Sequence, residues 1–263
     1  MIPYIGGKSQ LAKWIISHFP QEYQQLTYIE VFGGGGWVLF KKEESNLEVY
    51  NDLNHQLVNL FTVIRDQYPD FSHLCQWTLH SREMYLEAHK KVKENKFNSD
   101  IEKALQYAIR RVQSFSGSGG WGYAVQVHKP VSGMWLPFLR RLQLINARLK
   151  RTQIECLDFE NCIKKYDSPN AFFYLDPPYV NAEKYYNAPG ISFGREDHIR
   201  LAGLLNNLQG KFILSYYDDP LIRELYPGHR ILEKSGIKSS LGMTKQRGKK
   251  PRPVSKELLI LNY

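Results

Sequence analysis

The chain has 263 residues with a formal net charge of +9, and 43% of its residues are hydrophobic. This apolar content is enough for a folded core and excludes global disorder. No apolar run approaches the roughly 20 residues of a membrane span, and the N-terminus lacks a signal-peptide stretch. The three cysteines have neither the pattern of a disulfide framework nor that of a Cys-x-x-Cys metal site. We therefore expect a soluble cytoplasmic protein without a metal ion or a membrane contact.

The positive charge is concentrated in two segments of the chain. Residues 80–151 hold 14 basic and 5 acidic side chains, and residues 234–256 hold 8 basic and no acidic ones. The rest of the chain is net acidic. Two basic blocks on an acidic chain indicate a polyanionic partner, although solvated helix faces would give the same counts.

Seven β-rich runs alternate with helical patterns along most of the chain. The runs cover residues 27–32, 47–50, 152–156, 171–175, 211–216, 229–233 and 257–262. Several are almost continuously apolar, as expected of strands that are buried on both faces. Apolar residues at helical spacing, such as Leu57, Leu60 and Ile64, lie between them. This alternation predicts an α/β fold with a seven-stranded, mostly parallel sheet.

The stretch from 66 to 151 interrupts this alternation. It contains helical apolar stripes, a glycine- and serine-rich loop at 114–122, and no convincing pair of strands. We interpret 66–151 as a helical insertion that divides the α/β core into residues 1–65 and 152–263. The segment 235–253 is basic and poor in apolar residues, which predicts a loop or hairpin between the last two strands.

A glycine run, Gly33–Gly36, directly follows the first predicted strand. Glycines at this point let the backbone approach a ligand closely, although a tight turn would use them equally well. No Gly-Lys-Ser/Thr ending follows, which disfavours a P-loop. Asp52 ends the second strand, where a carboxylate can bind ribose hydroxyls or simply cap a helix. Together the two features favour a cofactor that contains a nucleoside.

The most specific motif is the tetrad Asp176-Pro177-Pro178-Tyr179 at the end of the run 171–175. Ligands of α/β sheets bind at the carboxyl ends of strands, and two prolines make the backbone rigid there. The Asp176 carboxylate and the Pro177 carbonyl are neighbouring acceptors for an amino group with two N–H donors. A neighbouring aromatic ring, Tyr179, suits a planar base.

Three motifs in order resemble the Dam family of adenine-N6 DNA methyltransferases. They are Pro3-Tyr4-Ile5-Gly6-Gly7-Lys8, then Phe32-Gly33-Gly34-Gly35, and finally the tetrad at 176–179. Their order, with a target-recognition region between the last two, is similar to class alpha of that family. The resemblance spans nearly the whole chain and is weakest in 66–151 and 235–253. It implies a Rossmann-like methyltransferase sheet and a helical target-recognition insertion.

The resemblance implies S-adenosylmethionine as the methyl donor and no metal. Asp52 would bind the ribose, and the turn after Phe32 would wrap the ribose and methionine portions. Asp158 and Phe159 would reach the adenine, although Leu157 replaces the family's usual glycine. The expected cofactor site comprises Tyr4, Gly6, Gly7, Lys8, Phe32, Gly33, Gly34, Gly35, Gly36, Asp52, Asp158, Phe159 and Asp176.

The expected catalytic residues are those of the tetrad. Hydrogen bonds from the adenine amino group to Asp176 and to the Pro177 carbonyl would make its nitrogen more nucleophilic, so that transfer depends on positioning. The base must leave the duplex to be reached, and Tyr179 would stack on it. Phe193 and Tyr216 are candidates either for the pocket wall or for the core.

Double-stranded DNA is the expected partner, and we expect a monomer in a bacterial nucleoid or a phage-infected host. Phosphate contacts from cations and a loop with aromatic residues would supply recognition. The candidates are Arg110, Arg111, Ser116, Trp121, Tyr123, Lys129, Arg140, Arg141, Lys245, Arg247, Lys249 and Lys250. The resemblance makes GATC only a weak default target, because the readout residues of GATC-specific members are not recognisable in this loop. The alternatives are methylation of RNA or of cytosine N4, and a non-catalytic DNA-binding module. A role with a restriction enzyme, in a phage or in housekeeping stays open.

Overall fold

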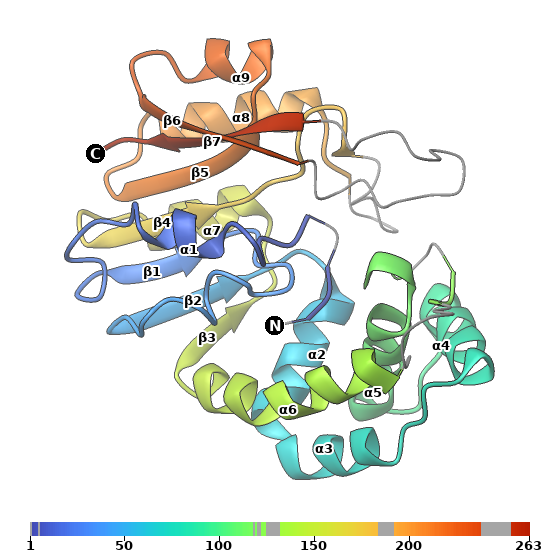
Figure 1. The fold of residues 1–263 in the computed structure, drawn as a ribbon. Coiled ribbons are helices and arrows are strands. Elements are labelled where there is room, and N and C mark those ends of the chain that lie inside the picture. The colour runs from blue at the N-terminus through green and yellow to red at the C-terminus, as the bar shows by residue number, and fades with distance from the viewer. Residues whose placement is uncertain are drawn as a thin grey trace.

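The computed structural model describes residues 2–4, 6–117, 119, 122–124, 132–183, 192–237 and 254–263. A seven-stranded sheet at its centre has the order β3-β2-β1-β4-β5-β7-β6 (Figure 1). The strands are β1 (Thr27–Glu30), β2 (Leu47–Asn51), β3 (Thr152–Glu155), β4 (Ala171–Leu175), β5 (Lys211–Tyr217), β6 (Arg230–Ile237) and β7 (Val254–Leu261). β7 runs antiparallel to both β5 and β6, and the other pairs of neighbouring strands are parallel. The predicted mostly parallel α/β sheet is confirmed, and β6 and β7 are longer than predicted.

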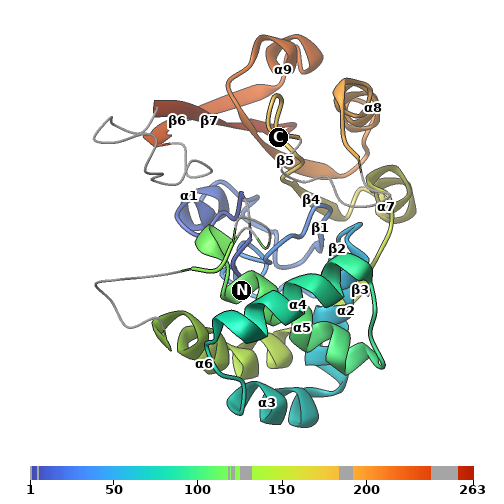
Figure 2. The ribbon, with the colours of Figure 1, turned by 90° about the vertical axis from the view of Figure 1, so that its right-hand side faces the viewer.

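Helices cover both faces of the sheet, because the strands are apolar on both. Side chains such as Ile29 and Phe173 face α7 (Phe159–Tyr166), α8 (Arg195–Leu205) and α9 (Pro220–Leu225). Their neighbours in sequence, such as Tyr28 and Phe172, point to the opposite face, which carries α1 (Ala12–Ile16). Figure 2 shows α1 on one side of the sheet and α7 and α8 on the other.

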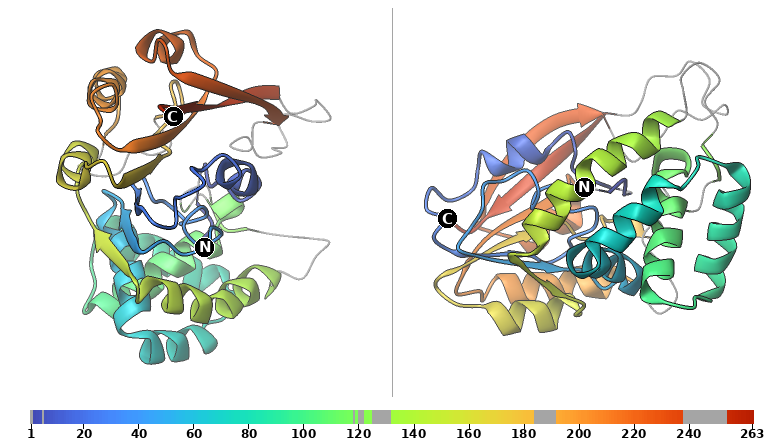
Figure 3. Two further views of the ribbon diagram at one scale, coloured as in Figure 1. Left: turned by 90° about the vertical axis from the view of Figure 1, so that its left-hand side faces the viewer. Right: turned by 90° about the horizontal axis from the view of Figure 1, so that it is seen from below.

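The region predicted as a helical insertion contains helices in its described residues. After α2 (His55–Asp66) come α3 (Tyr68–Gln76), α4 (Arg82–Glu94), α5 (Asp100–Val112), the short 3₁₀ helix η1 (Phe115–Gly117) and α6 (Ser132–Leu149). Asn54 caps α2 and Ser99 caps α5 through side-chain oxygens that accept backbone N–H groups. The views in Figure 3 show these helices gathered beside the β3 edge of the sheet. No helix among the residues described has the length and apolarity needed to cross a membrane.

The helices α2 to α6 share one apolar core with a face of the sheet. Buried residues of this core include Tyr28 and Phe172 of the sheet, Ala108 of α5 and Phe138 of α6. A buried ionic cluster reinforces the junction. Glu48 of β2 pairs with Lys42 at 2.5 Å and with the Arg148 Nε of α6 at 2.7 Å. The helices are therefore fixed to the sheet by both apolar packing and charge.

One side chain, Asn51, joins the ends of three neighbouring strands. Its Nδ2 donates to the carbonyl of Val31 after β1 and to that of Leu157 after β3, at 2.9 and 3.0 Å. Its Oδ1 accepts the Leu157 N–H at 2.8 Å. Because Asn51 is itself the last residue of β2 and is 1% exposed, it fixes the loops that follow β1, β2 and β3.

Candidate active site

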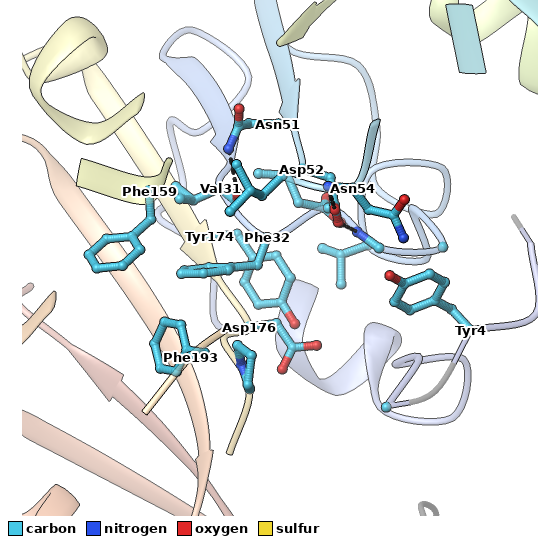
Figure 4. Close-up of a pocket in the computed structure, with 18 of the residues that line it drawn as sticks. Tyr4, Val31, Phe32, Asn51, Asp52, Asn54, Phe159, Tyr174, Asp176 and Phe193 are labelled. Atoms are coloured by element: carbon cyan, nitrogen blue, oxygen red, sulfur yellow. Dashed lines mark hydrogen bonds between the residues drawn. The ribbon is translucent and has the colours of Figure 1, made fainter. Parts of the chain in front are cut away.

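A pocket lies at the carboxyl ends of the parallel strands and brings together most of the predicted cofactor site (Figure 4). Its lining includes Tyr4, Gly6, Gly7, Lys8, Phe32, Gly33, Gly34, Gly35, Asp52, Asp158, Phe159, Asp176 and Pro178. Three predicted residues, Gly36, Pro177 and Tyr179, are not part of that lining. Glu30, Trp37, Tyr174, Phe193 and Arg200 also line the pocket. Parts of the chain that are far apart in sequence thus meet at one edge of the sheet.

The glycine turn after β1 packs too tightly for any other residue at Gly33. A Cβ atom there would lie 2.1 Å from the ring of Tyr50. Gly34 has a φ of +49°, and its N–H donates to the Asp52 carboxylate at 2.8 Å. The Tyr50 hydroxyl donates to the Gly34 carbonyl at 2.7 Å. The ends of β1 and β2 are therefore joined directly across the pocket wall.

Asp52 is a buried carboxylate that is held mainly by backbone groups. Its Oδ1 accepts the Asn54 N–H at 2.8 Å, and its Oδ2 accepts the Gly34 N–H. Burial raises the pKa of Asp52, and these two hydrogen bonds partly offset that effect. A carboxylate has about four lone-pair sites, so Asp52 retains acceptor capacity for the hydroxyl groups of a ligand.

Three phenylalanine rings form an aromatic cluster at one end of the pocket. Phe32 lies 5.8 Å from Phe159 and 5.9 Å from Phe193 between ring centroids, and Figure 4 shows all three at the end away from Tyr4. The Arg200 guanidinium lies 4.1 Å from the Phe159 centroid and pairs with Asp158 at 3.2 Å. Asp158 also caps α7. Such a cluster offers apolar faces to a planar heterocycle.

The tetrad carboxylate belongs to a buried ionic cluster. Lys8 Nζ lies 2.7 Å from Asp176 Oδ1 and 3.7 Å from Glu257 Oε1. Burial raises the pKa of Asp176, while the Lys8 cation opposes this effect. Burial alone would lower the pKa of Lys8, but the two carboxylates outweigh it and raise that pKa. Lys8 therefore stays charged and favours the ionised form of Asp176.

Tyr179 is enclosed next to this cluster. Its hydroxyl donates to Glu257 Oε1 at 2.5 Å, and Lys8 Nζ lies 4.7 Å from its ring centroid. The ring is edge-on to Tyr217 at 4.6 Å, and the residue is 5% exposed. Of the two rings for which the sequence left both a pocket and a core role open, Phe193 lines the pocket. Tyr216 is fully buried, with its hydroxyl 2.8 Å from His198 Nδ1.

The residues predicted to contact DNA have different surroundings. Arg140 is exposed on α6, whereas Arg110 and Arg141 are half-buried. Arg111 donates through Nε to the Tyr107 hydroxyl at 3.1 Å and lies over the Tyr4 ring at 4.5 Å.

Tyr123 packs against the ring of His80 at 5.2 Å. Ser116 is in η1, but its side chain is not among those described. Outside the described residues lie Trp121, Lys129, Lys245, Arg247, Lys249 and Lys250.

Three residues of the site region were not singled out from the sequence. Glu30 lines the pocket and accepts hydrogen bonds from the Tyr28 hydroxyl and the Leu39 N–H, while burial raises its pKa to about 8. Asn51 joins the strand ends, and Glu257 completes the cluster at Asp176. Each is a polar residue next to buried apolar residues of a strand, and this was the signal available in the sequence.

The comparison with known proteins agrees with the motifs found in the sequence. A family model described as "D12 class N6 adenine-specific DNA methyltransferase" matches residues 4–239. The chain belongs to this family. It is therefore an adenine-specific DNA methyltransferase with a Rossmann-like sheet, and membership implies S-adenosylmethionine as the methyl donor. No group of three or more potential metal ligands occurs among the residues that the structure describes.

Full-length relatives of this methyltransferase come from bacteria and from a virus. The Type II methyltransferase M1.LlaDCHI of Lactococcus lactis subsp. cremoris is 26% identical, over 99% of this chain and 94% of that protein. The Type II methyltransferase M.CviBI of Paramecium bursaria Chlorella virus NC1A is 25% identical, over 87% and 86%. The DNA adenine methylase of Haemophilus influenzae is 23% identical, over 86% and 82%. The similarity includes the helical region as well as the sheet.

Proposed function

We propose that the pocket binds S-adenosylmethionine and that Asp176 receives the amino group of an adenine flipped out of double-stranded DNA. One observation carries this proposal. Asp176 lines the same pocket as the glycine turn, Asp52 and the phenylalanine cluster. A cofactor that lies along the pocket would therefore be next to the carboxylate that holds the reacting amino group.

The residues of the pocket fit this cofactor in three ways. The phenylalanine cluster (Phe32, Phe159 and Phe193) suits the adenine ring, and Asp52 has acceptor capacity for the ribose hydroxyls. Gly33, Gly34 and Gly35 line the pocket with backbone and no side chain, so a ligand can approach this turn closely. The carboxylates of the pocket favour a cationic ligand, and S-adenosylmethionine supplies an electrophilic methyl group on a sulfonium ion.

The chemistry of the chain's own residues is to position and polarise the adenine. Asp176 and the Pro177 carbonyl accept hydrogen bonds from the two N–H groups of the amino group. These hydrogen bonds favour a tetrahedral nitrogen with an available lone pair. Lys8 Nζ lies 2.7 Å from Asp176 Oδ1, so the adenine amino group would compete with the Lys8 ammonium for this carboxylate. The Glu257 carboxylate, 3.7 Å from Lys8, offers it a second partner. The Tyr179 ring lies next to this cluster, 4.7 Å from Lys8 Nζ, and is the ring on which the base would stack.

The division of labour follows the two parts of the sequence. We assign cofactor binding and catalysis to residues 1–65 and 152–263, and target recognition to residues 66–151. The exposed Arg140 and the basic segment 234–256 would bind phosphates. The net positive charge lies in residues 80–151 and 234–256 and the rest of the chain is net acidic, which supports DNA contacts from these two segments.

A methyl-transfer assay tests the proposal directly. Labelled S-adenosylmethionine is incubated with duplex DNA, single-stranded DNA and RNA, and the products are digested to nucleosides. We expect N6-methyladenine in duplex DNA only. Asp176→Ala should abolish transfer while leaving DNA binding unchanged. Label only in RNA, or only in methylcytosine, would refute the assignment.

The recognition sequence is a separate question, for which GATC is our default proposal. Sequencing of methylated DNA from cells that express this chain would map the modified adenines. We expect a single short motif. A motif other than GATC would refute the default without affecting the proposed chemistry.

A further inference from the structure

We propose that Arg111 is a positioning residue that fastens the recognition loop to the cofactor pocket, instead of a phosphate contact. By recognition loop we mean the described residues 114–117, 119 and 122–124. The consequence is that the cofactor and DNA strengthen each other's binding through Arg111. This inference rests on the proposed function, because it needs a cofactor in the pocket described above.

Arg111 sits in the last turn of α5 between two aromatic rings. Its guanidinium carbon lies 4.5 Å from the Tyr4 ring centroid and 5.2 Å from that of Tyr107. Its Nε donates to the Tyr107 hydroxyl at 3.1 Å. Burial lowers the pKa of Arg111, but the neighbouring groups Tyr107, Tyr4 and Asp52 more than compensate and raise it. The guanidinium is thus half-buried, lies over two aromatic rings and donates a hydrogen bond to Tyr107.

The recognition loop is built around this side chain. Arg111 Nη1 lies at hydrogen-bond distance, 3.5 Å, from the Gly117 carbonyl. A Cβ atom on Gly119 would lie 3.1 Å from Arg111 Nε, so the loop backbone passes directly over the guanidinium. Ser114 Oγ donates to the Arg111 carbonyl at 3.0 Å and accepts the Gly119 N–H at 2.8 Å. The side chain and the backbone of Arg111 therefore both hold the loop.

The same side chain connects to the pocket by a short chain of hydrogen bonds. The Tyr107 hydroxyl accepts a hydrogen bond from Asn54 Nδ2 at 3.2 Å, and the backbone N–H of Asn54 donates to the Asp52 carboxylate at 2.8 Å. Asp52 and Tyr4 both line the pocket. Hydrogen bonds thus link Asp52 to Gly117 through Asn54, Tyr107 and Arg111.

A second contact joins the loop to the pocket wall without Arg111. Gly117 has a φ of +67°, and a Cβ atom there would lie 2.5 Å from the Cβ of Pro3. Pro3 immediately precedes Tyr4, which lines the pocket. A ligand that orders Tyr4 and Asp52 therefore also restricts the recognition loop. Coupling of this kind is reciprocal, so DNA that orders the loop must increase cofactor affinity by the same factor.

The two roles for Arg111 predict different measurements. A phosphate contact contributes equally to all DNA, and its loss reduces the slope of log affinity against log salt by about 1. A positioning residue leaves that slope unchanged, while its loss reduces the factor by which cofactor improves DNA binding. Typical coupling factors between two sites are about 5 to 150.

The experiment measures dissociation constants by titration, with and without S-adenosylhomocysteine, across a range of salt. The probe is an unmethylated duplex fragment that the wild-type enzyme methylates. We expect S-adenosylhomocysteine to tighten wild-type binding at least about fivefold. In Arg111→Gln and Arg111→Lys we expect this factor to fall below its wild-type value while the salt slope stays the same. Lysine keeps the charge but loses the planar stacking. The control Arg140→Gln, on the exposed face of α6, should lower the slope and keep the coupling.

Each outcome decides between the alternatives. A reduced salt slope with intact coupling in Arg111→Gln would overturn the proposal, as would a wild-type enzyme without coupling. If Arg111→Gln does not fold, as judged by thermal melting, Tyr107→Phe removes only the hydroxyl link and should still lower the coupling. A wild-type protein that fails to bind S-adenosylhomocysteine at all would instead refute the proposed function.

Discussion

At the scale of single residues, the proposed active site has one cation between two buried acids. Lys8 pairs with Asp176 and approaches Glu257, whose pKa burial raises. Without the positive charge of Lys8 between them, the carboxylates of Asp176 and Glu257 would not both remain ionised. The first segment of the chain thus controls the protonation of a carboxylate that lies 168 positions further along the sequence.

Replacement of Lys8 should shift the pH profile of the reaction. Asp176 must be ionised to accept the amino group, so activity falls as the pH drops through its raised pKa. Lys8→Met removes the cation that opposes this rise, and we expect the acid limb of kcat/KM to move upward by about one pH unit or more. Lys8→Arg, which keeps the charge, is the control. An acid limb at the same pH in Lys8→Met would contradict this role.

A second residue, Glu30, should make stability depend on pH. Burial raises its pKa to about 8 from 4.5, so the folded state binds an extra proton between these values. Its stabilising contribution is complete below about pH 4.5 and is lost as the pH rises through 8. Glu30→Gln keeps an acceptor for Tyr28 and Leu39 but cannot ionise. We expect denaturant titrations to show the variant gaining stability over wild type from pH 5 to 8. A constant difference would argue against a protonated Glu30.

At the scale of elements, the turn after β1 tolerates no side chain. Gly33→Ala would place a Cβ atom 2.1 Å from the Tyr50 ring, so that the ring or the turn must move. We expect a loss of about 1–3 kcal/mol in the free energy of unfolding, measured with urea, and weaker cofactor binding.

The matched control is Gly203→Ala in α8. A Cβ atom there meets nothing within 4 Å, and alanine favours a helix over glycine. We expect a gain of about 0.5–1 kcal/mol. If both variants were equally stable, the contact between the turn and β2 would not be tight.

The elements also show what could be predicted from the sequence. β-rich runs located all seven strands, and several of these runs are almost continuously apolar because parallel strands are buried on both faces. The motifs singled out Asp52 and Asp176, because cofactor binding and methyl transfer need particular residue types at the strand ends. The partners of these residues, such as Lys8 with Glu257, are distant in sequence and meet only through the strand order. The surroundings of Arg111 could not be predicted either, because a basic helix end does not indicate which aromatic rings pack against it.

At the scale of the molecule, the helical layer and the sheet form one packed unit. Arg148 of α6 pairs with the buried Glu48 of β2 at 2.7 Å, and Lys42 pairs with the same carboxylate. Removal of one partner from a buried ionic cluster leaves an uncompensated charge. The junction between the two layers is therefore sensitive to a single substitution.

Arg148→Met should destabilise the whole protein by about 3–5 kcal/mol. We expect urea unfolding to remain a single transition at a lower midpoint when fluorescence and circular dichroism are compared, because both layers share a core. The control is Arg151→Met, an exposed residue paired with Glu44, which should change stability by less than about 1 kcal/mol. Two separate transitions in wild type would show that the layers unfold independently.

The strand order has a consequence for synthesis of the protein. β7 is the last strand of the chain, yet it lies between β5 and β6. Until residues 254–261 have been made, β6 has no partner in the sheet, and β5 is an apolar edge that invites pairing with other chains. Glu257 arrives on the same strand, 3.7 Å from Lys8. The addition of β7 thus joins β6 to the sheet and brings Glu257 to Lys8 in the same step.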